Sequence, residues 1–403
     1  MRKNHLVILC LSIIAIVYVF SIAKDPILGD SLAFSVQACK GFDIGTNATN
    51  HFLYSNFLAL IFKLFPISVN PHYIFTSVSI LFSIATLWLI RKFLLLFDIS
   101  HKNTLLLFFL LGLSFTYWRI SIITEVYAFY IFFTVLFLYY VFRYVKTPKN
   151  STFIILSFIL GLCFLIHIQS ILLIPSYLLL AYKSMKIDYK QTIIGTCLFL
   201  VVSSILLIPV ALGKHDFMAI LNDDNPNYSF LKINIIESCK ALLRNIGFLV
   251  YNFTIFLYFI LIGFRKIQYK KYVLAILIPY FVFIIKHDVS DSYVFQLVPY
   301  VFLLVAMGKG VECKFNRLPI AIVLILPLFY FSTYKIIGYT QFGKKINNEK
   351  GFKGGVRYLM FPALNGNPPI DVFIKDYQNG KIDKKEEFKT QYNYAIEWKE
   401  KNK

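Results

Sequence analysis

Three carboxylates and a histidine lie close together in one early stretch of a chain that is otherwise rich in apolar residues. Residues 24–65 contain Asp25, Asp30 and Asp43, followed by His51. A carboxylate just beyond the end of a transmembrane helix can act as a general base towards a hydroxyl group, and partial burial beside the bilayer raises its pKa into a useful range. We therefore expect Asp30 to be a catalytic base. Asp25 precedes a proline and competes for this role, although Asp-Pro commonly starts a turn, and Asp43 within GFDIG indicates a turn.

The next polar residues open an apolar segment that is too short to cross a bilayer comfortably. This segment, 51–65, begins with His51 and Tyr54 and is interrupted by further polar side chains. Its length predicts a helix that lies along the outer membrane surface. A histidine at this depth could bind a lipid phosphate or orient a carboxylate, and a simple interfacial helix start is the alternative. We expect His51 and Tyr54 to contact the substrate.

A glutamate follows an aromatic cluster in YWRISIITEVYAFYIFF, residues 117–133. Tyr117 and Trp118 are typical of the aromatic belt at a membrane interface, which places Arg119 at the level of the outer headgroups. Glu125 would then lie one helical turn or more inside the following span, where a carboxylate is costly and indicates function. Arg119 or a histidine of a neighbouring helix is its expected partner. The alternative is a glutamate that joins helices by hydrogen bonding.

Two further outer helix junctions carry groups that suit anion binding. His167 marks the turn between two apolar segments, on the same side of the membrane as Asp30. Lys286, His287 and Asp291 lie at a later junction, in IIKHDVSDSYVFQLVPY. A cation here can bind an anionic phosphate group, whereas a wetted or charged loop is the alternative in both cases. We expect these four residues to bind substrate.

Metal and nucleotide sites have no recognisable pattern in this chain. The sequence contains no Cys-x-x-Cys pair and no Cys/His cluster with metal-ligand spacing. It also lacks the P-loop and the Gly-x-Gly-x-x-Gly loop that bind phosphates. We therefore predict no metal site, leave the use of a divalent metal open, and do not expect a nucleotide-dependent enzyme.

The elements that position these residues are apolar helices. The chain of 403 residues is 58% hydrophobic and only 15% charged, whereas soluble domains are about 45–50% apolar and about 25% charged. This composition predicts an all-α integral membrane protein. The N-terminal apolar run resembles a signal peptide but lacks a small-x-small cleavage site before Lys24, which favours an uncleaved first helix. The eleven expected spans are 6–23, 73–93, 104–118, 121–142, 152–167, 169–182, 192–212, 246–264, 272–286, 293–308 and 318–338.

The distribution of positive charge predicts the topology. If 51–65 does not cross the membrane, the basic clusters between the spans all share one side, which the positive-inside rule assigns to the cytoplasm. The N-terminus is then cytoplasmic, and nearly all residues suited to acid–base chemistry lie on the opposite side. The net charge of +20 is scattered among short loops, so we expect contact with anionic lipid headgroups rather than with nucleic acid.

The last part of the chain differs in composition from the rest. We divide the protein into a transmembrane core, 1–338, and a polar extracytoplasmic tail, 339–403. Within the tail, 383–400 has the pattern of an amphipathic helix. The tail is either a small helical cap or membrane-surface segment, or it takes part in recognising an acceptor.

Four blocks of residues, in order and spacing over about residues 1–310, resemble the GT-C superfamily of membrane glycosyltransferases, and most closely the bacterial proteins grouped near the protein O-mannosyltransferases. The family pattern Asp-Ser-Gly-Glu, then His-Pro-x-Gly-Tyr-Pro-Leu-Tyr, corresponds to a degenerate first loop here, and Trp-Ser-x-x-x-x-x-Glu-Val-Tyr-Ala-Leu is the most specific match. The matching blocks are Asp30-Ser31-Leu32-Ala33 with His51-Phe52-Leu53-Tyr54, Trp118-Arg119 with Glu125-Val126-Tyr127-Ala128-Phe129, Gly161-Leu162 with His167 and Pro175, and Asp291-Ser292-Tyr293 with Pro299-Tyr300.

This resemblance implies a bacterial inner-membrane enzyme whose donor is a polyprenyl-phosphate-linked sugar that arrives from the outer leaflet. It implies a direct displacement at the anomeric carbon, with Asp30 deprotonating the acceptor hydroxyl of a protein Ser/Thr, a glycan or a lipid. The leaving polyprenyl phosphate would be stabilised by cationic or hydrogen-bonding groups, for which the candidates are Arg119, His167, Lys286 and His287. Because the first loop lacks the acidic residue after Asp30 and the Gly-Tyr-Pro turn, the sugar and the acceptor stay open.

Two other functions remain as alternatives. A flippase or transporter of lipid-linked saccharides would favour internal repeats and broken helices in corresponding halves, and no such repeat is seen. A polymerase or ligase of lipid-linked saccharides would favour a large, arginine-rich outer loop in the second half, whereas 213–245 contains only Arg244.

Overall fold

The computed structural model describes residues 2–44, 51–65, 69–214, 235–286, 292–314 and 319–401, and every regular element in them is a helix. The elements are α1 (Arg2–Val19), α2 (Asp30–Lys40), α3 (Phe52–Leu64), α4 (Pro71–Leu96), α5 (His101–Gly112), α6 (Phe115–Ser121), α7 (Val126–Lys146), α8 (Asn150–Ile166), η1 (Ile168–Leu173), α9 (Ile174–Met185), α10 (Tyr189–Ser203), η2 (Ser204–Leu207), α11 (Ile208–Ala211), α12 (Ile235–Phe253), η4 (Thr254–Phe256), α13 (Leu257–Gly263), η5 (Phe264–Lys266), α14 (Lys270–Lys286), η6 (Ser292–Gln296), α15 (Leu297–Lys314), η7 (Ile320–Leu324), α16 (Ile325–Tyr339), α17 (Gln341–Glu349), η8 (Gly351–Lys353), α18 (Gly355–Met360), α19 (Ile370–Gln378) and α20 (Glu386–Lys401).

The long helices confirm the prediction of an all-helical membrane protein. In the described part of the chain, seven helices or continuous helical runs are long and apolar enough to cross a bilayer, and an eighth is formed if α5 and α6 are one bent span. Helices α1, α3 and α8 are apolar but shorter. Each of the eleven predicted segments overlaps a helix, but the count of eleven spans is not confirmed.

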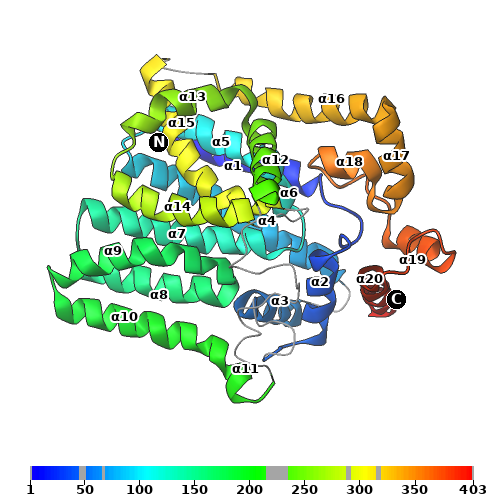
Figure 1. Cartoon of the computed structure of the whole chain (residues 1–403), viewed down its shortest axis with the longest axis horizontal. Helices are drawn as coiled ribbons and strands as arrows, with labels where there is room; N and C mark the ends of the chain where they lie inside the picture. Colours follow the sequence, from blue (N-terminus) through cyan, green and yellow to red (C-terminus); the bar gives the residue numbers. More distant parts are fainter. Residues whose placement is uncertain are drawn as a thin grey trace.

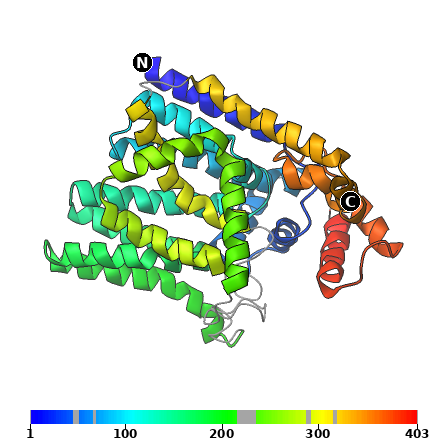
Figure 2. The same cartoon turned by 45° about the horizontal axis from the view of Figure 1, so that its top comes forward.

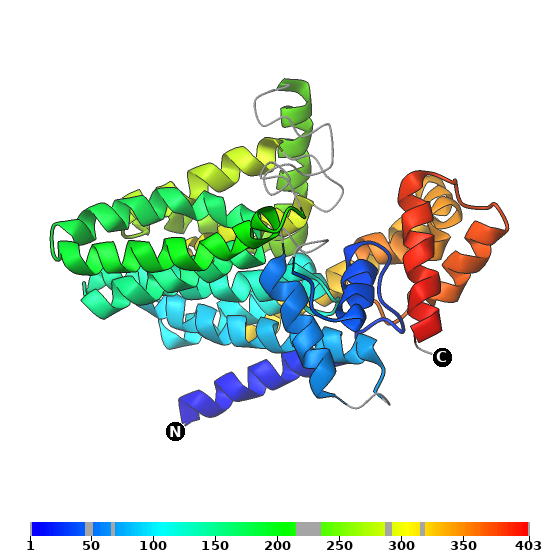
Figure 3. The ribbon, with the colours of Figure 1, turned by 90° about the horizontal axis from the view of Figure 1, so that it is seen from below.

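The first loop and the polar C-terminal segment share one end of the helix bundle. In Figure 1 the long helices run across the page, while α2, α3 and α17 to α20 lie at the end marked by the C-terminus. Figure 2 shows α12 crossing the neighbouring helices steeply, and Figure 3 shows the two chain termini at opposite ends of the molecule. The assignment of each loop to one side of the membrane stays a prediction.

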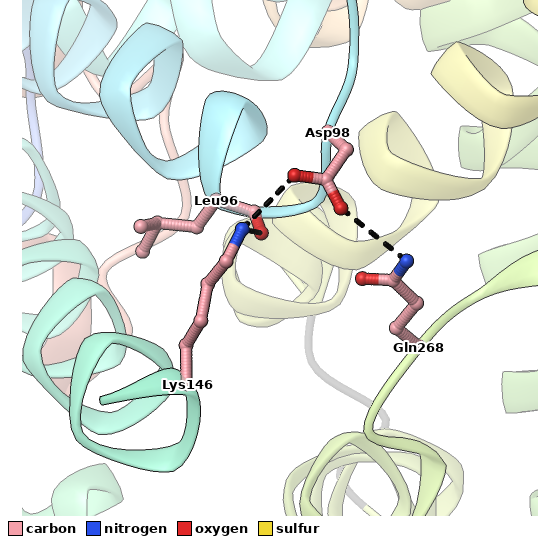
Figure 4. Close-up of polar contacts among 4 residues, drawn as sticks. All are labelled: Leu96, Asp98, Lys146 and Gln268. Atoms are coloured by element: carbon pink, nitrogen blue, oxygen red, sulfur yellow. Dashed lines mark hydrogen bonds and ion pairs between the residues drawn. The ribbon is translucent and has the colours of Figure 1, made fainter. Parts of the chain in front are cut away.

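A small polar cluster joins three of the loops expected on the cytoplasmic side. Asp98, which follows α4 with φ 55°, accepts a hydrogen bond from Lys146 at 2.9 Å and another from Gln268 at 3.4 Å, and Lys146 also donates to the Leu96 carbonyl oxygen (Figure 4). The hydrogen bond from Lys146 is the main cause that lowers the pKa of Asp98. The ends of α4 and α7 and the start of α14 are thus held together.

The predicted span 104–118 is broken rather than straight. Helices α5 and α6 meet at an angle of 67°, which exposes backbone N–H groups inside an apolar region, where each needs a partner. The Phe115 N–H donates to the Tyr330 hydroxyl at 2.9 Å, and the Thr116 N–H donates to Asn252 Oδ1 at 2.8 Å. These two remote side chains explain how the break is tolerated.

The polar C-terminal segment folds back onto the first loop. Helices α17 to α20 form a unit that we call the cap, residues 340–401, and α20 confirms the amphipathic helix predicted at 383–400. A second hydrophobic core joins the cap to one face of α2. It consists of Leu32, Val36, Ile370, Phe373, Ile374, Ile382, Ala395 and Trp398.

Candidate functional site

Helix α2 carries Asp30 at its first position. The turn before it depends on Gly29, whose φ of 113° is rarely adopted by residues with a side chain. Asp30 is exposed, so the partial burial expected from the sequence is wrong, although Ser31 and Leu32 of the same turn are buried. Asp30 and Phe34 are four residues apart and share one face of the helix.

Phe34 connects that face to the start of α3. Its ring lies edge-on to His51, with centroids 5.4 Å apart, and to Tyr54, with centroids 5.1 Å apart. Tyr54 is fully buried, and burial together with the nearby Glu125 carboxylate raises its pKa well above the ordinary value. The face of α2 that carries Asp30 and Phe34 therefore lies against the start of α3, where Tyr54 is close to Glu125.

His51 and His167 form the centre of the cluster. Their ring centroids are 5.0 Å apart with the planes at 60°. His51 Nδ1 lies 3.1 Å from the Ile166 carbonyl oxygen, which only accepts, so this nitrogen carries the proton. His167 Nδ1 accepts from the Gln169 N–H at 3.1 Å, so the proton of its neutral ring is on Nε2. Burial, and then the neighbouring His51, lower the pKa of His167 well below its ordinary value.

Two tyrosines of α7 complete the aromatic wall around His167. The ring of Tyr127 lies 5.4 Å from it and that of Tyr130 lies 5.3 Å from it. Tyr127 also contacts Phe295 of η6, at 6.3 Å. Tyr127 belongs to the Glu-Val-Tyr-Ala block, so the most specific motif of the sequence lies against the predicted histidine.

Glu125 begins α7 instead of lying inside it. Its backbone is extended, and its carboxylate accepts a hydrogen bond from the Val126 N–H at 3.1 Å. The expected position one turn or more within the span is wrong, because the chain between α6 and α7 does not continue the helix over Ile122–Thr124. Glu125 is half-buried, next to Tyr54 rather than deep among the spans.

Arg119 lies in a different place from the histidines. Its side chain is 3% exposed and its guanidinium donates to the carbonyl oxygens of Tyr358, Phe361 and Pro362. The cap folds over this end of α6 and supplies the acceptors, so the guanidinium contacts protein carbonyl groups, and its position at the level of the headgroups stays a prediction. These contacts favour a role in holding the cap, and a direct role towards substrate stays a prediction.

The remaining predicted residues lie at the end of α14. Lys286 is the last residue of this helix and is half-buried. His287 and Asp291 lie outside the described residues. Among the residues that are described, no group of three or more His, Cys, Asp or Glu side chains could hold a metal ion.

Asp25, the competing base of the sequence analysis, has a structural contact: it accepts from the Ile370 N–H at 3.0 Å and so caps α19. The structure also reveals polar groups that the sequence analysis did not combine into a site. Asn245, Gln296, Tyr300 and Asn252 form a buried hydrogen-bonded chain between α12 and α15. The sequence signal for this hydrogen-bonded network was the presence of amide side chains in or next to predicted spans.

Part of the chain matches a known protein family. Residues 109–191 match the family model described as the protein O-mannosyl-transferase TMEM260 N-terminal domain. This stretch contains Arg119, Glu125 and His167, so the predicted resemblance to the protein O-mannosyltransferases is confirmed over the part of the chain that carries the Glu-Val-Tyr-Ala block. No curated protein matches the chain.

Two solved structures are similar in outline. The Saccharomyces cerevisiae protein O-mannosyltransferase Pmt1–Pmt2 complex bound to the sugar donor aligns with a TM-score of 0.40 and 16% identity, covering 55% of this chain and 33% of that chain. The Archaeoglobus fulgidus oligosaccharyltransferase in complex with Zn and sulfate aligns with a TM-score of 0.48 and 11% identity, covering 96% of this chain and 57% of that chain. The chain thus spans about a third of the first relative and just over half of the second.

Proposed function

We propose that this protein is a multi-pass membrane glycosyltransferase that moves a sugar from a polyprenyl-phosphate-linked donor to a hydroxyl acceptor. The site faces the non-cytoplasmic side, and the donor enters from the outer leaflet of a bacterial inner membrane. The observation that carries the proposal is the convergence of His51, beside α2, with His167 and Tyr127 from the stretch that matches the O-mannosyltransferase family model.

Asp30 acts as the base in this proposal. Its carboxylate takes the proton of the acceptor hydroxyl while the acceptor oxygen attacks the anomeric carbon. The bond between that carbon and the phosphate oxygen breaks, and the electron pair leaves with the polyprenyl phosphate. An exposed carboxylate at the first turn of α2 is accessible to a protein, glycan or lipid acceptor, and the N-terminal end of a helix stabilises its negative charge.

The two histidines act on the donor in complementary ways. The neutral ring of His167 keeps its Nε2–H as a donor for a phosphate oxygen, because its Nδ1 is held by the Gln169 N–H. The ring of His51 donates through Nδ1 to the Ile166 carbonyl, which fixes the orientation of the ring beside His167, and His51 contacts the sugar. Lys286 and His287 supply positive charge for the leaving phosphate, and Glu125 and Tyr54 orient the sugar.

A donor assay tests this function directly. Membranes that contain the protein are incubated with a set of polyprenyl-phosphate-linked sugars, each carrying a radioactive label, and the acceptor fraction is analysed by mass spectrometry. We expect label to move from the lipid to protein, glycan or lipid acceptors only when the protein is present. Label that crosses the membrane while it stays on the lipid would instead indicate a flippase.

A further inference from the structure

The loop that leads to Asp30 is tied to the cap at several points along its length. The Asn365 side chain donates to the Phe20 carbonyl at 2.9 Å, and the Leu364 N–H donates to the Ser21 carbonyl at 2.8 Å. Further along, Asp25 accepts from the Ile370 N–H. The backbone between α1 and α2 is therefore held by residues from the other end of the chain.

The last of these ties lies directly beside Asp30. The Gly29 N–H donates to Gln391 Oε1 of α20 at 2.8 Å. Gly29 is the residue whose positive φ starts α2, so this hydrogen bond fixes the turn that aims Asp30. No other side chain among the described residues binds the Gly29 N–H.

The packing of α2 on α20 also holds α2 in position. Trp398, 3% exposed, packs with Leu32 and Val36 in the second core, two and six residues after Asp30. At the far end of α2, Lys40 forms an ion pair with Glu397 at 2.8 Å. Both ends and one face of α2 thus depend on the cap for their position.

We propose that the cap positions Asp30 for catalysis and that Gln391 is the positioning residue nearest to it. The inference rests on the proposed function, in which Asp30 is the base. Gln391 does not touch the reacting atoms; it acts through the Gly29 turn. A displacement of about 1 Å in a catalytic group can lower the rate by about 10²-fold, so loss of this contact should affect the chemical step more than donor binding.

Substitution of Gln391 separates positioning from general stability. We expect Gln391→Leu to lower kcat at least tenfold and to change the KM for the donor less than twofold, because the donor groups lie elsewhere. Gln391→Glu keeps an acceptor oxygen at the same chain length and should recover most of kcat. The exposed Lys389→Ala, on the same helix, is the matched control and should leave kcat unchanged. A kcat within twofold of wild type for Gln391→Leu would overturn the inference.

A labelling experiment reports cap docking without relying on activity. Cys39 of α2 is unpaired, and burial raises the pKa of its thiol to about 11. In a variant where Cys39 is the sole cysteine, Trp398→Ala should undock α20 and speed maleimide labelling of Cys39 at least tenfold, with a parallel fall in kcat. Faster labelling with unchanged kcat, or unchanged labelling, would contradict positioning by the cap.

The outcomes also distinguish this inference from the proposed function. If wild type transfers no sugar from any donor, the proposed function fails, and labelling still reports the docking. If wild type is active and Asp30→Asn is inactive while Gln391→Leu keeps full kcat, only the positioning role fails.

Discussion

His51 and His167 lie edge to face, with ring centroids 5.0 Å apart, and their backbone partners select opposite proton positions for the two rings. His167 keeps Nε2–H as a donor, whereas the backbone contact of His51 places a proton on its Nδ1. Because His167 is 9% exposed and next to a second imidazole, the neutral form of its ring is favoured. His167 can therefore donate a hydrogen bond to a ligand without carrying a positive charge.

The depressed pKa of His167 predicts how stability depends on pH. Below the unfolded-state pKa of about 6.5, the unfolded chain binds a proton at this histidine and the folded protein does not. Protonation therefore favours the unfolded chain, so the free energy of unfolding is highest above pH 6.5 and falls as the pH decreases towards the folded-state pKa. The slope reaches about 1.4 kcal/mol per pH unit. His167→Gln should remove this part of the dependence, measured as Tm in detergent between pH 5 and 7.5. An identical pH profile for the variant would contradict the neutral, buried ring.

Glu125→Gln tests whether the carboxylate at the start of α7 is needed for chemistry. The glutamine oxygen can still accept from the Val126 N–H, so Tm should be nearly unchanged. If Glu125 orients the sugar through its charge, transfer should fall by about 10²-fold, within the range of acid–base contributions. Measurement of kcat and Tm on the same preparation checks both. Wild-type kcat in this variant would leave Glu125 with a capping role only.

Arg119→Ala should loosen the cap. The substitution leaves three carbonyl oxygens, one in a buried and two in partly buried contacts, without the guanidinium donor, and hydrogen bonds to charged groups contribute about 1.5–3 kcal/mol each. We expect a clear loss in Tm and faster proteolysis between α18 and α20. Arg357→Ala removes an exposed contact to Asn365 and is the control. Unchanged Tm and proteolysis for Arg119→Ala, together with lost donor binding, would favour the phosphate role predicted from the sequence.

Asn252→Leu tests the broken helix. The change removes the acceptor of the Thr116 N–H, and an unpaired buried donor costs about 1–3 kcal/mol. Tyr330→Phe removes the acceptor of the Phe115 N–H and should have a similar effect on Tm. Because both partners hold the same break, the double variant should cost less than the sum of the single variants. Strict additivity would indicate that the two contacts act independently.

The sequence predicts the helices better than it predicts the site. Each predicted apolar segment overlaps a helix, although the count of eleven spans is not confirmed. Three loops that the charge pattern assigns to one side meet at Asp98, Lys146 and Gln268. The bend between α5 and α6 was not predicted, because the side chains that satisfy it, Asn252 and Tyr330, are far away in the sequence.

The sequence predicts which site residues lie close together only in part, for a physical reason. His51, Tyr54 and His167 stood out because polar groups in apolar segments are rare, and the structure brings them together; their roles towards substrate stay predictions. The position of Glu125 within a helix was wrong, since apolar periodicity does not reveal where α7 begins. Nor does it reveal that the cap returns over α6 and contacts Arg119. The contact between Gly29 and Gln391 leaves no local signal at all.

The most direct test of the proposed function is the rate of sugar transfer by Asp30→Asn. The amide keeps the size of the side chain but cannot accept the proton, so we expect kcat to fall by at least about 10²-fold with unchanged Tm and membrane insertion. Asp98→Asn, at the opposite end of the bundle, is the matched control and should keep its activity per folded molecule. Transfer by Asp30→Asn at the wild-type rate would show that Asp30 is not the base and would contradict the proposed mechanism.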